Sequence, residues 1–372
     1  MKKRIVLLNS CKGLYGGIES FLLNVFRCLD RDIFDVTFLT CGISTYDLYK
    51  DEIKNKGGKI DCVNTYPNNL NNQYVAYNKL KEYFYINKPN IVHINSSALS
   101  FQILASTAAS KAKVPQIILH SHNFVPNIQY LKKSCRNIFK PILTDNGTSF
   151  LACSKDASEW MFEKKIKDKV IIIPNGINIS EFRFNRQKRD LYRKEFSISD
   201  DTTIIGHVGR FQKQKNHKFI IDIFVKYLAK NPKAVLMLAG EGELKSVVME
   251  YAYNKGILNK VVFLGERNDM GSFFAAMDIF VFPSLFEGFG IAALEAQAAG
   301  IPTFVSNTVT NEVNVTGNVH FLPINDSEIW SNEILKARPN HSRERFADLI
   351  IDAGYDKVQS GKRMQNIYLG RY

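Results

Sequence analysis

The most informative segment of the chain reads Pro283-Ser-Leu-Phe-Glu-Gly-Phe-Gly-Ile-Ala-Ala-Leu-Glu-Ala-Gln-Ala-Ala-Gly-Ile-Pro302. It carries two carboxylates, Glu287 and Glu295, and a Gly-Phe-Gly loop between them that runs into a helix rich in Ala and Leu. Residues 276–282, just before it, are an apolar run typical of a buried strand. Gly300 marks the end of the helix. A loop that leaves a strand and enters a helix gathers free backbone N–H groups beside the positive helix end, which suits phosphate.

Short apolar runs and helical patterns alternate along the rest of the chain. Strands are expected at residues 5–8, 36–39, 60–63, 91–94, 116–119, 150–153, 170–173, 204–208, 235–238, 261–264 and 279–282. Helical patterns separate most of them, and this alternation implies parallel sheets covered on both faces. The turn residues Pro174-Asn-Gly176 end the first series. At 372 residues the chain exceeds what one core supports, so the expected class is α/β with two doubly wound, Rossmann-like domains.

Four further motifs lie at strand ends, where open α/β sheets bind their ligands. They are Gly16-Gly-Ile-Glu19, Leu119-His-Ser-His-Asn123, Val170-Ile-Ile-Ile-Pro-Asn-Gly-Ile-Asn178 and Gly209-Arg-Phe-Gln-Lys-Gln-Lys-Asn216. The first is a glycine loop in which backbone can approach a phosphate, and the last is basic. The glycine loop lacks the G-x-G-x-x-G spacing, which argues against a dinucleotide enzyme.

Together with the glutamate pair, these motifs resemble, in the same order, the retaining glycosyltransferases of family 4, in particular those of bacterial capsule and exopolysaccharide synthesis. The resemblance covers nearly the whole chain and implies the GT-B fold, in which two domains face a central cleft. It implies an acceptor-side domain at residues 1–173 and a domain binding a nucleotide-diphosphate sugar at 174–354. The helix at 355–372 is then expected to pack back on the first domain.

The resemblance also assigns roles to individual residues. Arg210 and Lys215 are expected to hold the donor diphosphate in place of a metal ion, where fixed cations strengthen their hold as negative charge grows on the leaving group. His122 is expected near the donor sugar, with Glu287 at the sugar or the phosphate loop and Glu295 on the ribose hydroxyls. His122, Arg210, Lys215 and Glu287 form the expected catalytic set.

The remaining candidates lie at these strand ends or at the ends of neighbouring strands. For the donor they are Gly16, Gly17, Glu266, Arg267, Gly288, Phe289, Gly290 and Ile291. Backbone groups near Glu266 and Arg267 are expected to read the base, and those of residues 288–291 the distal phosphate and sugar. For the acceptor they are His93, Asn95 and His120. Strand alternation places His120 and His122 on the same side of their strand.

Each assignment has a structural alternative. Arg210 and Lys215 also fit a structural arginine and an exposed lysine, and Glu287 also fits a charge that complements the helix dipole. Histidines are often structural. Glu295 lacks such an alternative, because a carboxylate among Ala and Leu needs a partner. The family has Asp after its histidine, whereas this chain has Asn123, so the role of that position stays open.

The net charge of +13 raises the question of an anionic partner. No nucleic-acid-binding motif is visible, so nucleic acid is not expected. Residues 128–143 include Lys132, Lys133, Arg136 and Lys140, no acid, and interleaved apolar side chains. This pattern fits either an anionic membrane surface or a solvated helix.

The six cysteines are scattered and fit a reducing compartment, with neither a disulfide framework nor a zinc site expected. Polar residues interrupt residues 89–110, the longest uncharged segment, so it is not expected to span a bilayer. These features predict a cytoplasmic protein, peripheral on the inner membrane face if the basic segment binds lipid.

The expected activity is metal-independent retaining transfer of a sugar, without a cofactor, from a UDP-linked donor to a glycan or lipid-linked acceptor of surface polysaccharide synthesis. Two rivals stay open. One is a sugar-nucleotide epimerase of the same architecture, which does not normally carry the Arg, Lys and paired Glu set. The other is a non-catalytic sugar-nucleotide-binding subunit, which would not need it.

Overall fold

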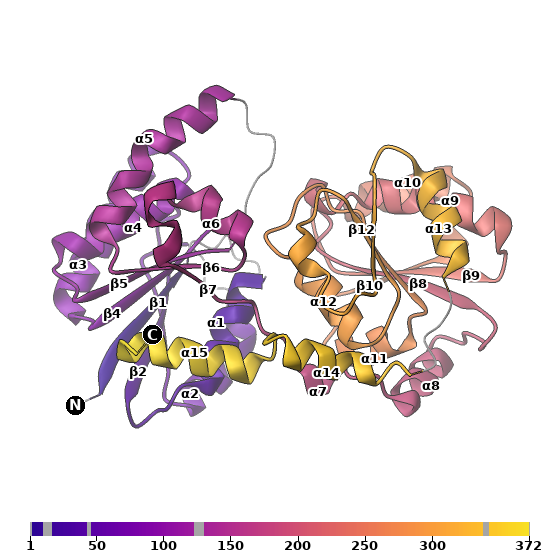
Figure 1. Cartoon of the computed structure of the whole chain (residues 1–372), viewed down its shortest axis with the longest axis horizontal. Coiled ribbons are helices and arrows are strands. Elements are labelled where there is room, and N and C mark those ends of the chain that lie inside the picture. Colours follow the sequence, from indigo (N-terminus) through magenta and orange to yellow (C-terminus); the bar gives the residue numbers. More distant parts are fainter. Residues whose placement is uncertain (1, 10–16, 43–45, 123–129, 338–341, 372) are drawn as a thin grey trace. The chain divides into compact units, whose positions relative to one another are not determined.

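The chain forms two compact units (Figure 1). The computed structural model describes residues 2–9, 17–42, 46–122, 130–337 and 342–371, and only the backbone at 130–136. One unit comprises Met1–Gly176 with Lys357–Tyr372, and the other comprises Ile177–Asp356. From the sequence, the divisions are expected after residues 173 and 354.

The first unit is built on a parallel sheet whose strands follow the order β3-β2-β1-β4-β5-β6-β7 in the described part of the chain. Their bounds are β1 Lys3–Asn9, β2 Phe34–Thr40, β3 Lys59–Cys62, β4 Ile91–Asn95, β5 Gln116–Ser121, β6 Ser149–Ala152 and β7 Val170–Ile172. All were predicted as strands. The winding direction reverses between β1 and β4, the position at which doubly wound sheets bind ligands.

Helices cover both faces of this sheet. The residues that α1 (Gly17–Cys28), α2 (Lys50–Asn55) and α15 (Lys357–Leu369) bury against it belong to one hydrophobic cluster. Those of α3 (Leu70–Asn87), α4 (Leu99–Lys111) and α5 (Tyr130–Asn146) belong to another, beside α6 (Lys155–Met161). Because Met364, Ile367 and Tyr368 of α15 are buried with Phe21 and Phe26 of α1, the expected return of the C-terminal helix to the first unit is confirmed.

The second unit repeats the plan with a parallel sheet in the order β10-β9-β8-β11-β12-β13. The strands are β8 Thr203–Val208, β9 Ala234–Ala239, β10 Val261–Gly265, β11 Ile279–Phe282, β12 Thr303–Ser306 and β13 Val319–Leu322. Its winding reverses between β8 and β11. The two units together confirm the doubly wound α/β prediction.

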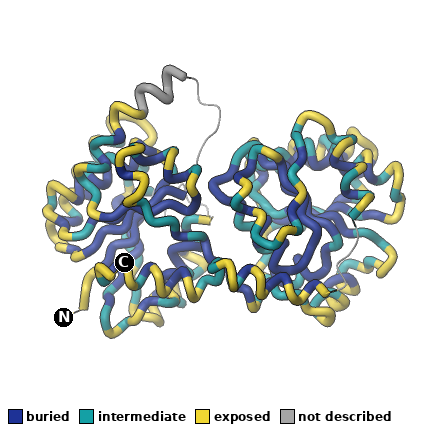
Figure 2. The backbone as a smooth tube through the Cα atoms, viewed as in Figure 1, coloured by how far each residue is buried: buried dark blue, intermediate teal, exposed yellow. Residues whose placement is uncertain are grey.

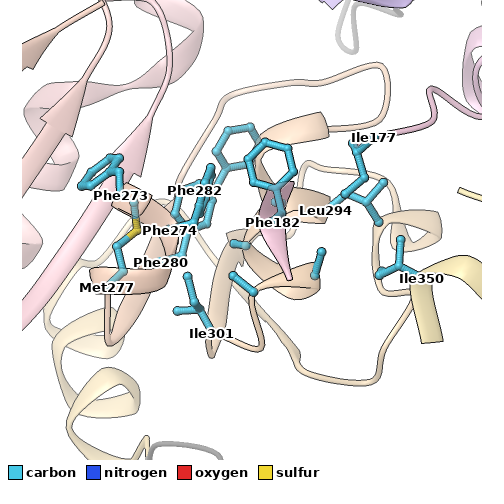
Figure 3. Packing of buried hydrophobic residues seen from close by; sticks show 14 of the residues in the cluster. Ile177, Phe182, Phe273, Phe274, Met277, Phe280, Phe282, Leu294, Ile301 and Ile350 are labelled. Carbon is cyan, nitrogen blue, oxygen red and sulfur yellow. The ribbon is translucent and has the colours of Figure 1, made fainter. Parts of the chain in front are cut away.

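Helices α9 (His217–Lys230), α10 (Lys245–Asn254) and α13 (Ser327–Lys336) share one core of the second unit. The opposite core joins α7 (Ile179–Phe182), α8 (Arg186–Glu195), α11 (Met270–Ala276), α12 (Ile291–Ala298) and α14 (Arg345–Asp352). Figure 3 shows Phe182, Phe280 and Leu294 packed in that core. Short 3-10 helices lie at Asp47–Tyr49, Lys164–Lys169, Lys213–Lys215, Leu258–Lys260 and Asn311–Val313. In both units the central strands are largely buried, and the exposed positions lie mainly on the outer helices and loops (Figure 2).

Local signals fix several element ends. Ser154 caps α6 by accepting a hydrogen bond from the backbone N–H of Ala157 at 3.1 Å. Gly300 has a φ of +68° just beyond α12, the left-handed conformation that glycine adopts at helix ends. Strands β12 and β13 were not predicted, and two of the four residues of β12 are polar.

Candidate active site

A polar cluster in the first unit follows from strand alternation. Residues two apart in a strand point to the same face. On the face covered by α1 and α15, the sheet supplies Ile5, Leu7, Ile91 and Ile118 to the core. The next residues of that alternation, at or near the carboxyl ends of their strands, are Asn9 of β1, His93 and Asn95 of β4, and His120 of β5. All four are buried.

Hydrogen bonds join the three histidines of this cluster to two polar residues. His122 Nε2 lies 2.9 Å from Asn95 Oδ1. His93 Nε2 lies 3.2 Å from His120 Nδ1, and His93 Nδ1 lies 2.7 Å from the Tyr368 hydroxyl of α15. The His120 and His122 rings are 4.0 Å apart between centroids, so the prediction that they share one side of the strand is confirmed.

Burial keeps these imidazoles neutral. Desolvation lowers the pKa of His93 and His120 well below the ordinary value, and the neighbouring histidines add to the shift. It lowers the pKa of His122 to about 3. At neutral pH each ring therefore has one N–H donor and one acceptor nitrogen.

Helix α1 closes over the cluster. The Phe21 ring lies 5.0 Å from that of His120 and 5.2 Å from that of His122, measured between centroids. Asn9 Nδ2 donates to the Glu19 carboxylate at 2.8 Å. Gly17 is the exposed first residue of α1, whereas Gly16 lies outside the described residues.

In the second unit, the loops after β8, β9 and β10 are tied together. Phe211 N–H donates to Glu241 O at 2.9 Å, and Gly240 N–H donates to Gly265 O at 2.8 Å. Gly240 has a φ of +135°, and a Cβ there would lie 2.3 Å from Gly209 O. Only glycine fits this contact, so the loop bearing the basic motif is held firmly.

The loop after β8 is also tied to the loop after β11. Leu285 N–H donates to Gln214 O at 2.8 Å, and Gln214 Nε2 donates back to Phe286 O at 2.8 Å. These reciprocal bonds bring the basic motif and the glutamate motif side by side. The loops that they join follow β8 and β11, the strands between which the winding reverses.

Two predicted site residues form an ion pair at this junction. Lys215 Nζ lies 2.6 Å from Glu287 Oε1, with side chains 15% and 10% exposed. The same ammonium lies 4.6 Å from the centroid of the Phe282 ring. Both charges are thus held in a largely buried position, where electrostatic interactions are stronger than in water. Arg210 is half-buried on the same loop.

Glu295 lies within α12, as predicted, and is half-buried. The described part of the chain gives its carboxylate neither a hydrogen bond nor an ion pair. Burial raises its pKa to about 8, and the carboxylate of Glu181 adds to the shift. Glu295 is therefore mainly protonated at neutral pH when no ligand is bound.

The remaining donor-side candidates differ in what their side chains do. Gly290 precedes α12 with a φ of +93°. The Phe289 ring is buried and stacks on Tyr355 at 5.1 Å, so only its backbone is left for a ligand. Arg267 Nε donates to Asp269 at 2.7 Å, and this contact raises the pKa of the arginine. The others are Glu266, which is exposed, Gly288, which is buried, and Ile291, which is half-buried.

In the basic segment, the position of Lys140 differs from the one expected from the sequence. Both alternatives for this segment, an anionic membrane surface and a solvated helix, left the Lys140 ammonium exposed, but Lys140 is buried and donates to the backbone oxygens of Glu159 at 2.9 Å and Phe162 at 3.0 Å. Its neighbours Ile138 and Phe139 are 71% and 51% exposed. The side chains of Lys132, Lys133 and Arg136 lie outside the described residues.

None of the helices in the described part of the chain has the length and apolar composition needed to cross a bilayer. No three His, Cys, Asp or Glu side chains in the described ranges are grouped so that they could hold a metal ion.

The sequence matches two protein-family models. Glycosyltransferase Family 4 matches residues 15–181, and Glycosyl transferases group 1 matches residues 188–348. Putative glycosyltransferase EpsF of Bacillus subtilis is 30% identical over 367 residues, which cover 95% of this chain and 93% of that protein. An Escherichia coli protein named UDP-Gal:alpha-D-GlcNAc-diphosphoundecaprenol alpha-1,3-galactosyltransferase is 28% identical over 374 residues, covering 96% and 94%.

Solved structures share the fold. Anabaena Alr3699/HepE in complex with UDP-glucose has a TM-score of 0.79 and 16% sequence identity, with 99% of each chain covered. WaaG, a glycosyltransferase involved in lipopolysaccharide biosynthesis, has a TM-score of 0.71 and 15% identity, covering 99% of this chain and 100% of that one.

Proposed function

The chain belongs to glycosyltransferase family 4, and on that premise we propose that it transfers a sugar, with retention, from a nucleotide-diphosphate sugar to a lipid-linked glycan of surface polysaccharide synthesis. The observation that carries the proposal is the ion pair of Lys215 and Glu287, which holds a cation at a strand end 2.6 Å from the first carboxylate of the glutamate pair. Such a fixed cation suits a diphosphate leaving group.

The donor is proposed to be a UDP-linked sugar. The E. coli relative is named as a user of UDP-Gal, and the HepE structure contains UDP-glucose. In this chain, Arg210 and Lys215 would hold the diphosphate, and backbone N–H groups before α12 would hold its distal end. Glu295 would meet the ribose hydroxyls, which offer partners to its half-buried carboxyl group.

The transfer step is proposed to need no metal ion. As the bond between sugar and diphosphate breaks, negative charge grows on the phosphate oxygens, and Arg210 and Lys215 gain interaction energy with it. Glu287 would hold the Lys215 side chain in its orientation while no substrate is bound. The acceptor hydroxyl attacks the same face of the sugar, and the departing phosphate takes its proton.

The polar cluster of the first unit is proposed to bind sugar hydroxyls. His122 is neutral, so it can form directed hydrogen bonds but is not an acid at neutral pH. Buried polar groups in proteins are nearly always hydrogen-bonded, and two ring nitrogens of this cluster, His120 Nε2 and His122 Nδ1, have no partner in the described structure. Hydroxyl groups would supply those partners.

The acceptor is proposed to be lipid-linked and the protein to bind the membrane surface from the cytoplasm. The E. coli relative is named for a diphosphoundecaprenol-linked substrate. On this chain, the exposed Ile138 and Phe139 of α5 support a contact with lipid. Lys140 is excluded from that contact because its ammonium is buried.

A panel of nucleotide sugars tests the proposal through the melting temperature of the full chain. A ligand at one hundred times its dissociation constant adds about 2.7 kcal/mol of stability, a shift of several degrees. We expect the UDP sugars to raise the melting temperature and Lys215→Met to reduce the rise. A donor that is bound and slowly hydrolysed identifies an enzyme, whereas binding without turnover under any condition identifies a binding subunit. Absence of any shift across the panel contradicts the proposed donor.

A further inference from the structure

A chain of hydrogen bonds runs from the C-terminal helix to the histidine cluster. The Tyr368 hydroxyl of α15 contacts His93 Nδ1 at 2.7 Å, and His93 Nε2 contacts His120 Nδ1 at 3.2 Å. The described structure gives His120 Nε2 no partner. Tyr368, His93 and His120 are buried in the described structure, so a polar group left without a partner there costs free energy.

The numbers of donors and acceptors determine the direction in which these hydrogen bonds run from Tyr368 to His120. If Tyr368 donates, then His93 accepts at Nδ1 and donates from Nε2, and His120 accepts at Nδ1. Only the Nε2–H of His120 is then without a partner. In the reverse direction, the phenol hydrogen of Tyr368 and the Nε2 lone pair of His120 are both unmet. Because unmet buried polar groups cost free energy, the first arrangement is favoured.

A second set of hydrogen bonds fixes the tautomer of His122. Asn95 Nδ2 donates to His93 O at 3.0 Å and to Leu8 O at 3.5 Å. These two carbonyls orient the amide, so Asn95 Oδ1 is the atom that faces His122 Nε2 at 2.9 Å. An oxygen of this kind only accepts, so His122 carries its proton on Nε2 and leaves Nδ1 as an unpartnered acceptor.

We propose that Tyr368 and Asn95 are positioning residues that hold His120 and His122 as Nε2–H tautomers, so that these two neighbouring rings offer a substrate one donor and one acceptor. The donor is His120 Nε2–H and the acceptor is His122 Nδ1. A sugar hydroxyl both donates and accepts, so a pair of opposite polarity suits a polyhydroxylated ligand. This inference rests on the proposed binding of sugar by the cluster, and it assigns Asn95 to orientation of His122 in place of the acceptor contact expected from the sequence.

Nitrogen-15 NMR of the imidazole rings in the full chain reads the tautomers without any substrate. We expect His93, His120 and His122 to show the Nε2–H pattern. Tyr368→Phe keeps the ring but removes the donor, so His93 and His120 should become mixtures while His122 stays unchanged. Asn95→Ala should do the reverse, and the unaffected ring in each variant reports that the fold is intact.

Tyr227→Phe is the matched control, because it removes another buried hydroxyl, bonded to Asn231 at 3.0 Å in the second unit. It should leave all three tautomers in place. With the donor found above, kcat/KM should fall between about two- and tenfold in Tyr368→Phe and stay constant in the control.

An Nδ1–H tautomer at His120 in the parent, or unchanged tautomers in Tyr368→Phe, overturns the inference. Tautomers that shift while kcat/KM is constant refute the part in which the pair meets the substrate. Failure of the proposed function looks different, since the parent itself would then bind none of the nucleotide sugars.

Discussion

Replacement of Glu295 by Gln should stabilise the second unit, and increasingly so as the pH rises. The carboxyl group has a pKa of about 8 in the folded chain and 4.5 as the reference value for the unfolded one. Below pH 4.5 both states are protonated and the group costs nothing. Between pH 4.5 and 8 the unfolded state releases its proton more readily, so stability falls as the pH rises. Gln has the same shape as the protonated acid and does not titrate.

The structure limits the size of this effect. Each pKa unit corresponds to about 1.4 kcal/mol, so the interval from 4.5 to about 8 sets a ceiling of about 5 kcal/mol above pH 8. Glu295 is only half-buried, and solvent screening reduces the expected gain to about 1–3 kcal/mol. For a unit of this size, that gain corresponds to an increase of about 2–12 °C in melting temperature.

Calorimetry of the parent and the variant from pH 4.5 to 9, without ligand, measures the gain. Glu250→Gln, an exposed change on α10 of the same unit, is the control and should give no pH-dependent difference. The melting temperatures of parent and Glu295→Gln should converge at pH 4.5 and diverge towards pH 8. Parallel curves across this range would refute the idea that burial perturbs Glu295.

Three further results are expected. In a double-mutant cycle of Lys215→Met and Glu287→Gln, unfolding of the parent and variants should give a coupling of about 1–3 kcal/mol, and independent effects would show that the ion pair contributes nothing. Gly240→Ala should lower stability by about 1–3 kcal/mol in thermal unfolding, because its φ of +135° and the nearby carbonyl disfavour a side chain; a neutral effect would mean that the loop yields. Serine at both Ile138 and Phe139 should reduce co-sedimentation with anionic vesicles, and equal pelleting of parent and variant would rule out α5 as the contact.

Much of the fold could be predicted because the alternation of apolar runs with helical patterns can be recognised from local sequence alone. β12 escaped because Thr303-Phe-Val-Ser306 offers two apolar residues between two polar ones, too few to show a period. Lys140 was misassigned for a related reason. A cationic residue on a helix is assumed to be solvated, but its ammonium reaches two backbone carbonyls at the end of α6 and beyond.

The sequence predicted which residues belong to the site better than it predicted which of them contact one another. Lys215 and Glu287 were each assigned to the ligand, yet they bind each other across 72 positions of sequence. The two residues have opposite charges and follow the neighbouring strands β8 and β11, and this combination could have suggested the pair. The contact of Tyr368 with His93 spans 275 positions and depends on how α15 packs, so strand and helix patterns alone do not reveal it.

The configuration of the product linkage tests the central claim most directly. The full chain, treated with a chelator, is incubated with the UDP sugar that raises its melting temperature and with a lipid-diphosphate-linked sugar as acceptor. NMR of the product then gives the anomeric configuration of the new bond. We predict that the configuration of the donor is retained and that turnover survives chelation. An inverted linkage, or activity that disappears with the chelator and returns with Mg²⁺, would contradict metal-independent retaining transfer.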